Sequence, residues 1–238
     1  MTLDQLYGKL DGLTAEAIAA FWSGRDQQLQ KQLLSGKADQ GHRGAATGGK
    51  HFDGMLLLLS AFLQAAGIPE SSIFAQKSLE IPGFYRPTKK WDLLVVHQGQ
   101  LLVVLETKAI VGSFGNNCNN RAEEAIGNAA DLWRAHRDEV YKSPNPPWLG
   151  FVFIVEDAEG SRNPVDVKEP HFKVLKEFKG ASYKERCRLL CRKLMAERQY
   201  TATAYITTKK DHSYAQPDRD LHLERFIRSM CGHVQAHL

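Results

Sequence analysis

The sequence predicts an α/β (α+β) fold in which a mixed β-sheet core is flanked by helices. Two apolar runs, at 91–96 and 101–105, are joined by a polar segment that contains Gly99, which is typical of a β-hairpin. A third apolar run, at 149–155, is continuous and lies between two prolines and two acidic residues, as expected for a strand buried on both faces. Segments with helical periodicity precede, separate and follow these runs, so helices should cover the sheet.

Two helices and a strand are expected before the hairpin. Thr14 should cap a first helix that ends before Gly36. A second helix, at about 51–66, is apolar nearly all round and should be buried, and a strand follows at 73–81. The elements expected after the hairpin are a helix at 121–141 capped by Asn120, the strand at 149–155, a helix from the capping box at Ser182 to about 198, a strand at 200–208 and a helix at 220–234.

Two carboxylates and one amine converge at the open end of the predicted hairpin. Asp92 stands at the head of the first strand, and Glu106 and Lys108 stand at the tail of the second. Since successive side chains of a strand point to opposite faces, Glu106 and Lys108 share one face, and antiparallel pairing brings Asp92 beside them. Ionised groups are costly next to a core unless something compensates them, and a divalent cation would do so.

Such a cluster suits phosphodiester hydrolysis, although a pair of ordinary salt-bridged strand ends is the alternative. Asp92 and Glu106, with the backbone carbonyl of Thr107, are the predicted ligands of Mg²⁺, a hard cation that prefers oxygen. The metal would polarise the phosphate and acidify a bound water, while Lys108 would orient that water and stabilise the transition state. Two further acids are weaker candidates for this site, Asp53 and Glu80.

The pattern Asp-x(13)-Glu-x-Lys across a hairpin resembles the core of the PD-(D/E)xK nuclease superfamily. More narrowly, the stretch 113–125 with the following Asp131-Leu132-Trp133, and the stretch 86–92, are similar to the XhoI family of restriction endonucleases. The similarity runs from about Arg43 to the C-terminus. One departure is that Trp91, instead of proline, precedes the first aspartate.

The resemblance implies a type II restriction endonuclease that cuts double-stranded DNA with Mg²⁺. It further implies the palindromic target CTCGAG, 5′-phosphate ends, a homodimer that mirrors the symmetry of the target, and a companion DNA methyltransferase that protects the host. Two other functions stay open at this point. One is a repair or recombination nuclease of the same superfamily, and the other is a DNA-binding module without catalysis.

Residues that could contact DNA gather in three segments. A glycine-rich loop at 36–50 and a basic loop before Asp92 carry cations suited to phosphates, and an asparagine-rich block carries side chains suited to base edges. The asparagines could equally shape a turn or cap a helix. The candidates are Arg43, Lys50, Arg86, Lys89, Lys90, Ser113, Asn116, Asn117, Asn119, Asn120 and Arg121.

Charge adds a weaker signal for DNA binding. The whole chain carries only +4, but residues 161–210 hold 13 Lys and Arg against 5 Asp and Glu. A face held against a polyanion would explain this asymmetry, and a solvated helix face would explain it equally well.

Composition places the chain among ordinary globular proteins. Its length fits one nuclease domain over 1–238, in which 1–50 form a helical N-terminal extension and a loop near DNA. The four cysteines have no metal-binding spacing and should be buried thiols. With no basic leader and no apolar stretch long enough to span a bilayer, the expectation is a cytoplasmic protein that does not enter the membrane.

Overall fold

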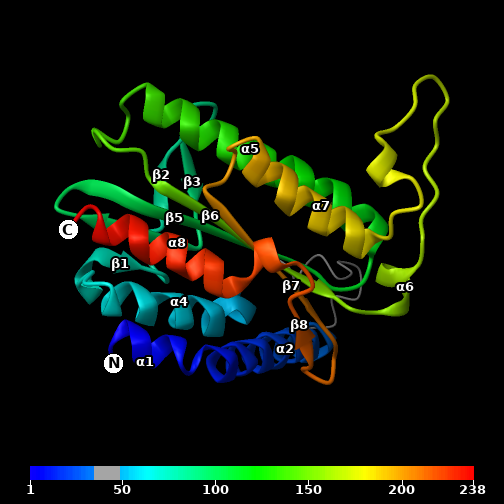
Figure 1. Cartoon of the computed structure of the whole chain (residues 1–238), viewed down its shortest axis with the longest axis horizontal. Coiled ribbons are helices and arrows are strands. Elements are labelled where there is room, and N and C mark those ends of the chain that lie inside the picture. The colour runs from blue at the N-terminus through cyan, green and yellow to red at the C-terminus, as the bar shows by residue number, and fades with distance from the viewer. Residues whose placement is uncertain (35–48) are drawn as a thin grey trace.

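The computed structural model describes residues 1–34 and 49–238, and its centre is a six-stranded sheet (Figure 1). The strands lie in the order β1-β4-β5-β6-β7-β8. The pairs β5–β6 and β6–β7 are parallel and the others antiparallel, so the sheet is mixed, as predicted. Its strands are β1 (Ile73–Phe74), β4 (Leu93–His97), β5 (Gln100–Ile110), β6 (Trp148–Glu156), β7 (Ala202–Thr208) and β8 (Tyr214–Ala215).

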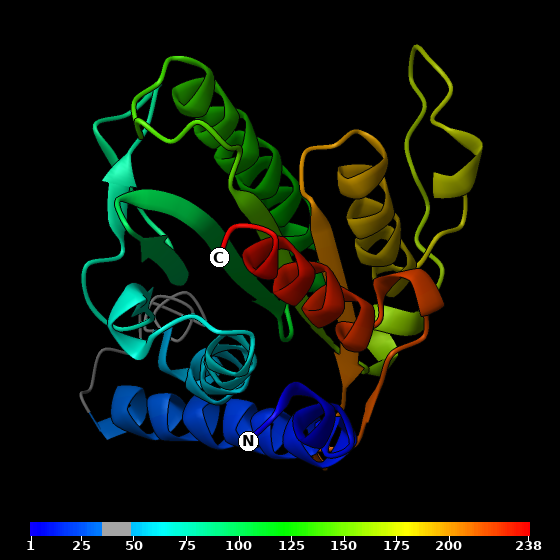
Figure 2. The same ribbon diagram turned by 60° about the vertical axis from the view of Figure 1, so that its left-hand side comes forward.

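Helices cover both faces of this sheet (Figures 1 and 2). On one face lie α4 (Asp53–Ala65) and α8 (Leu223–Gln235), with α1 (Leu3–Tyr7) and α2 (Leu10–Leu34) packed outside α4. On the other face lie α5 (Phe114–Arg137) and α7 (Tyr183–Ala196). Shorter elements connect them: η2 (Gly49–Phe52), η3 (Glu70–Ser72), α6 (Glu159–Arg162), η4 (Lys176–Phe178) and η5 (Arg219–Leu221).

Strand periodicity divides the apolar core into two layers. In β4, Leu93 and Val95 pack with α4 and α8, whereas Leu94 packs with α5 and α7. The central strand β6 is buried along its whole length, because helices cover it on both sides and strands flank it on both edges. The four cysteines are buried free thiols, as predicted. In the parts of the chain that the structure describes, no helix is long and apolar enough to cross a membrane.

Several boundaries differ from the sequence predictions. Thr14 does not cap a helix: its Oγ1 donates to the carbonyl of Leu10 inside α2, a bond available to threonine in a helix interior. The strand predicted at 73–81 is two strands. Ser78 has φ 56° between β1 and β2 (Glu80–Pro82), and β2 pairs with β3 (Thr88–Lys90) in a separate two-stranded sheet.

The helix predicted at 121–141 begins earlier than expected. Asn120 therefore lies inside the helix, and the prediction that it caps the helix was wrong. α5 starts at Phe114 after Ser113, which has φ 45°, and the asparagine-rich block forms its first two turns. Asparagine is a poor helix former, but burial of Cys118 and of the α5 stripe against the sheet overrides that preference. Ile126 is 46% exposed, so it lies off the buried stripe of α5.

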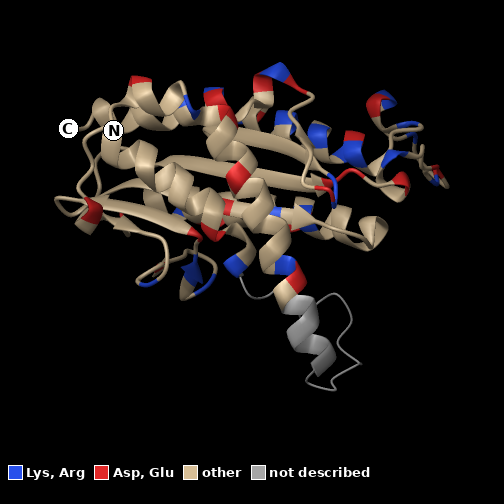
Figure 3. Ribbon diagram, turned by 90° about the horizontal axis from the view of Figure 1, so that it is seen from below, with Lys and Arg blue, Asp and Glu red and all other residues tan. Residues whose placement is uncertain are grey.

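Many of the basic side chains in residues 161–210 form ion pairs with acidic side chains of the same chain. On α7, Lys184 pairs with Asp157, Arg188 and Arg192 pair with Asp218, and Lys193 pairs with Glu177. Basic and acidic positions are interspersed over the helices and loops (Figure 3). The charge asymmetry of residues 161–210 is therefore matched by acids inside and outside that segment, and it provides little support for DNA binding.

Asp218 should be a substantial contributor to stability, because it is buried and accepts from Arg188 Nη1 (2.6 Å) and Arg192 Nη2 (2.7 Å). These hydrogen bonds, Arg192 first, lower the pKa of Asp218 to about 2. Asp218→Asn should cost about 1–3 kcal/mol of unfolding free energy at pH 7. The cost should shrink as pH falls from the ordinary Asp pKa near 3.9 through about 2, since the wild type then loses its charge as well.

Thermal unfolding of the two proteins against pH measures this difference. Asp166→Asn, at an exposed aspartate of the same charge, is the matched control and should have no such effect. A constant difference between wild type and Asp218→Asn down to pH 2 would contradict the assignment.

Candidate active site

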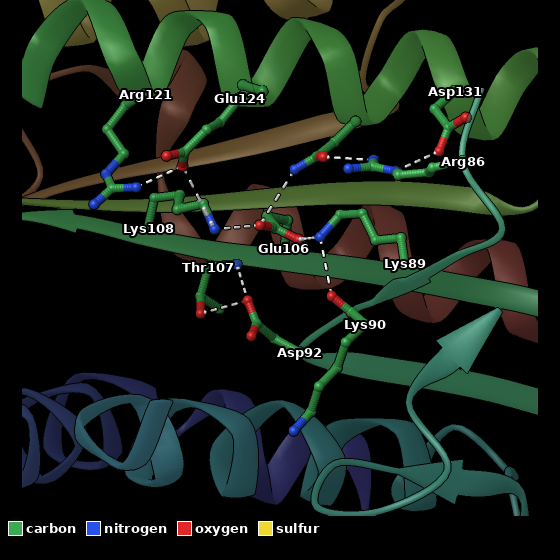
Figure 4. A network of polar contacts seen from close by, with 12 residues as sticks. Arg86, Lys89, Lys90, Asp92, Glu106, Thr107, Lys108, Arg121, Glu124 and Asp131 are labelled. Atoms are coloured by element: carbon green, nitrogen blue, oxygen red, sulfur yellow. Dashed lines mark hydrogen bonds and ion pairs between the residues drawn. The ribbon is translucent and has the colours of Figure 1, made fainter. Parts of the chain in front are cut away.

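The hairpin that carries the cluster is built as the sequence predicts. β4 and β5 pair from Leu93 with Leu105 to His97 with Gln100, and the turn residues Gln98 and Gly99 both have positive φ. This is the conformation that matches the twist of a two-residue hairpin. β5 continues to Ile110 after β4 has ended its pairing, so, among the described residues, 106–110 have a strand partner only in β6. The cluster lies at this open edge (Figure 4).

Asp92 lies directly before β4 and is held by Thr107. Its backbone N–H donates to the carbonyl of Leu105 (3.1 Å), and its Oδ2 accepts from the N–H (2.6 Å) and the hydroxyl (2.9 Å) of Thr107. Burial, followed by the nearby charge of Glu106, raises the pKa of Asp92 above its ordinary value. The two carboxylates therefore repel each other, and a cation bound between them would relieve this repulsion.

Glu106 is buried, with 2% of its side chain exposed, and it faces α5. Its Oε2 accepts from Lys89 Nζ (2.7 Å), and its Oε1 contacts Lys108 Nζ and Asn128 Nδ2, the latter at 3.3 Å. Lys89 also lies 4.4 Å above the ring of Trp91. The structure thus places Lys89 inside the cluster, whereas the sequence analysis assigned it to contacts with DNA phosphates.

Lys108 lies on the same face as Glu106, as the strand period predicts. Burial lowers the pKa of its amine, but contact with Glu106 outweighs burial, and the net shift is upward. Glu124 of α5 lies 3.8 Å from the same amine and also binds Arg121. Lys108 is therefore a cation at neutral pH and cannot serve as a general base there.

The donor set fits a hard cation such as Mg²⁺. The Thr107 N–H points towards Asp92, and since the N–H and C=O of one strand residue point to the same side, its carbonyl also faces this edge. The bonds from Thr107 occupy only Oδ2 of Asp92. In the described parts of the chain no three His, Cys, Asp or Glu side chains gather as a metal site. Mg²⁺ needs only one or two carboxylates, because it keeps several waters.

The two weaker acid candidates lie elsewhere. Asp53 is exposed in the first turn of α4, the position that the helix dipole favours for a carboxylate. Glu80 is exposed on β2, where it pairs in register with Lys90. In the described structure, neither acid forms a hydrogen bond with Asp92 or Glu106.

The predicted phosphate-binding cations also separate. Lys50 is exposed in η2, and Arg43 lies outside the described residues. Lys90 is exposed and points away from Glu106 (Figure 4). The guanidinium of Arg86 binds Asp131 and Asn128, although its side chain is 41% exposed.

The asparagine-rich block presents one exposed face at the start of α5. Asn116, Asn119 and Asn120 are exposed at helical spacing, next to exposed Ser113. Asn117 is half-buried and its Nδ2 donates to the Gly112 carbonyl at 3.4 Å. Arg121 pairs with Glu124, which in turn lies beside Lys108, so this face begins close to the acid–lysine cluster.

Sequence reasoning missed two residues of the site, Asn128 and Asp131. Both are buried on α5 and connect Glu106 to the β2–β3 hairpin. A polar side chain on the inward stripe of an otherwise apolar helix face was the available signal, since Asn128 and Asp131 lie among Ala125, Ala129 and Leu132.

A mixed sheet that contains this hairpin and is covered by helices on both faces is consistent with a restriction-endonuclease-like fold. Comparison with known proteins agrees: the family model for "Restriction endonuclease XhoI" matches residues 31–217. The chain therefore belongs to the XhoI family of restriction endonucleases, which makes it a type II site-specific deoxyribonuclease. No solved structure matches the chain.

Three curated relatives are type II restriction enzymes. BstVI from Geobacillus stearothermophilus is 44% identical over 216 residues, which cover 87% of this chain and 96% of the relative. XhoI from Xanthomonas vasicola is 41% identical over 198 residues, with coverage of 82% and 78%. AbrI from Azospirillum brasilense is 43% identical over 160 residues, with coverage of 66% and 72%. These relatives favour restriction over repair, recombination or binding without catalysis.

Proposed function

We propose that this chain hydrolyses both strands of double-stranded DNA at the palindrome CTCGAG, with Mg²⁺ held by Asp92 and Glu106, and leaves 5′-phosphate ends. The observation that carries the proposal is the convergence of two carboxylates and a protonated lysine at the open edge of the hairpin, in a member of a restriction endonuclease family. The XhoI resemblance supplies the target sequence.

Asp92, Glu106 and the Thr107 carbonyl would hold the metal, which when bound supplies a Lewis acid at the scissile phosphate. Thr107 fixes the Asp92 carboxylate through two hydrogen bonds to Oδ2, so Oδ1 would be available to the metal. Lys108, kept protonated by Glu106, orients the attacking water and offsets the charge that develops on the phosphoryl oxygens. In-line attack by water would form a bond to phosphorus and break the bond from phosphorus to O3′. The phosphate then stays on the 5′ end, and O3′ leaves and takes up a proton as the 3′-hydroxyl.

Recognition of the target would come from the exposed face of α5. Asn116, Asn119 and Asn120 have the amide geometry for base edges, and Ser113, Asn117 and Arg121 border them. Lys50 and Lys90, which are exposed, and Arg43 would contact phosphates.

A palindromic target has two equivalent strands, so we propose a homodimer with one active site for each strand. The whole chain would act as one nuclease domain, with residues 1–50 as a helical N-terminal extension and a loop near DNA. A DNA methyltransferase that modifies the same sequence would protect the host DNA.

Digestion of linear DNA with one CTCGAG site tests the proposal, with a substrate that differs by one base pair as control. In Mg²⁺, we expect two products from the first substrate and none from the second, with four-base 5′ overhangs when the ends are sequenced. Random fragments, or cleavage that persists after all divalent cations are chelated, would contradict the proposal.

A further inference from the structure

We propose that Asn128 is a positioning residue: it orients the Glu106 carboxylate and ties it to the hairpin β2–β3. The inference rests on the proposed role of Glu106 as a metal ligand. It is carried by a continuous chain of hydrogen bonds from Glu106 through Asn128 and Arg86 to Asp131 (Figure 4).

Asp131 anchors the tip of the hairpin to α5. Its buried carboxylate accepts from the N–H groups of Phe84 and Tyr85, each at 2.8 Å, and from Arg86 Nε, also at 2.8 Å. A Cβ on Gly83 would lie 2.5 Å from Asp131 Oδ2, so glycine is required for this close approach. The anchored tip leaves Tyr85 73% exposed at the surface.

Asn128 lies between this anchor and the catalytic cluster. Its Oδ1 accepts from Arg86 Nη2 at 2.8 Å, while its Nδ2 donates to Glu106 Oε1 at 3.3 Å. A side-chain amide offers an acceptor to the guanidinium and a donor to the carboxylate at the same time. Since Asn128 is buried, an unpaired amide there would be costly, and both of its groups are paired.

The three donors to Glu106 differ in charge, and this difference gives Asn128 its role. Lys89 and Lys108 are cations, so a metal ion at Glu106 would compete with them for the carboxylate charge. The amide of Asn128 is neutral, so its hydrogen bond is compatible with a metal on the same carboxylate. It can therefore set the direction of Glu106 in the loaded site, as hydrogen bonds to metal-binding carboxylates generally do.

Asn128→Ala should raise the Mg²⁺ concentration for half-maximal cleavage about 10–100-fold. The affinity of this variant for DNA, measured without divalent cations, should be unchanged, because Asp131 still anchors the β2–β3 hairpin. The matched control is Gly127→Ala on the same helix: residue 127 is exposed, a Cβ there meets nothing within 4 Å, and the Mg²⁺ requirement should stay at the wild-type value.

Asn128→Asp provides a second, isosteric test that keeps the acceptor for Arg86. A carboxylate at 128 can no longer donate to Glu106 Oε1, so Asn128→Asp should also move the Mg²⁺ concentration for half-maximal cleavage away from the wild-type value. A merely structural role would lower the melting temperature of both variants and leave the Mg²⁺ requirement unchanged, which would overturn the inference.

Glu106→Gln separates this inference from the proposed function. If Glu106→Gln cleaves like the wild type, the proposed function itself fails. If Glu106→Gln is inactive while Asn128→Ala and Asn128→Asp match Gly127→Ala, only the role of Asn128 fails.

Discussion

Lys108→Ala should lower the rate of DNA cleavage about 10²–10⁴-fold, the range typical for loss of a positioned proton-handling or charge-stabilising group. The amine of Lys108 contacts Glu106 and lies on the edge where Asp92 is held. Its raised pKa keeps it charged at neutral pH, so alanine removes both a hydrogen-bond donor for water and a positive charge beside the phosphate.

Single-turnover cleavage with saturating enzyme and Mg²⁺ measures this effect without interference from product release. Lys9→Ala, at an exposed lysine between α1 and α2, controls for the loss of one positive charge. DNA affinity should change little in Lys108→Ala. A variant that binds DNA and cleaves at the wild-type rate would remove Lys108 from the mechanism.

Asp92→Asn should abolish Mg²⁺-dependent cleavage and yet stabilise the metal-free protein. Asparagine keeps an oxygen that can accept both bonds from Thr107, but it removes a charge that burial and Glu106 disfavour. A stabilisation on the order of 1 kcal/mol would raise the melting temperature by about 2–4 °C in a chain of this size.

The pH dependence follows from the upward shift of the Asp92 pKa. A carboxyl group that binds its proton more readily in the folded state destabilises that state as pH rises through and above its unfolded pKa. The advantage of Asp92→Asn should therefore grow as pH rises above the ordinary Asp pKa and vanish in acid, below that pKa. Asp53→Asn, at an exposed acid of α4, should show no such gain. A lower melting temperature for Asp92→Asn at pH 7 would contradict this account.

Local patterns were sufficient to predict the hairpin and the meeting of its ends. Alternating and continuous apolar runs set β4, β5 and β6, and the strand period places Glu106 and Lys108 on one face. The start of α5 was not predictable in this way, because its first turns are rich in asparagine and form a helix only through packing of Cys118 and Phe114.

Long-range contacts explain what sequence reasoning missed at the site. Lys89 and Arg86 look like free cations in a basic loop, but β2–β3 folds as a separate small sheet whose side chains reach Glu106 and α5. The polar partners on α5, Asn128 and Asp131, lie 22 and 47 residues from the groups that they bind at Glu106 and Phe84. No local period in the sequence indicates such pairings.

The shared metal site of Asp92 and Glu106 is tested most directly by crystals soaked in Mn²⁺, which takes the same oxygen ligands as Mg²⁺ and scatters anomalously. We expect one anomalous peak bound by both carboxylates and the Thr107 carbonyl, with Lys108 beside it, and no peak in crystals of Asp92→Asn. A peak at another set of side chains, with none between Asp92 and Glu106, would contradict the proposed mechanism.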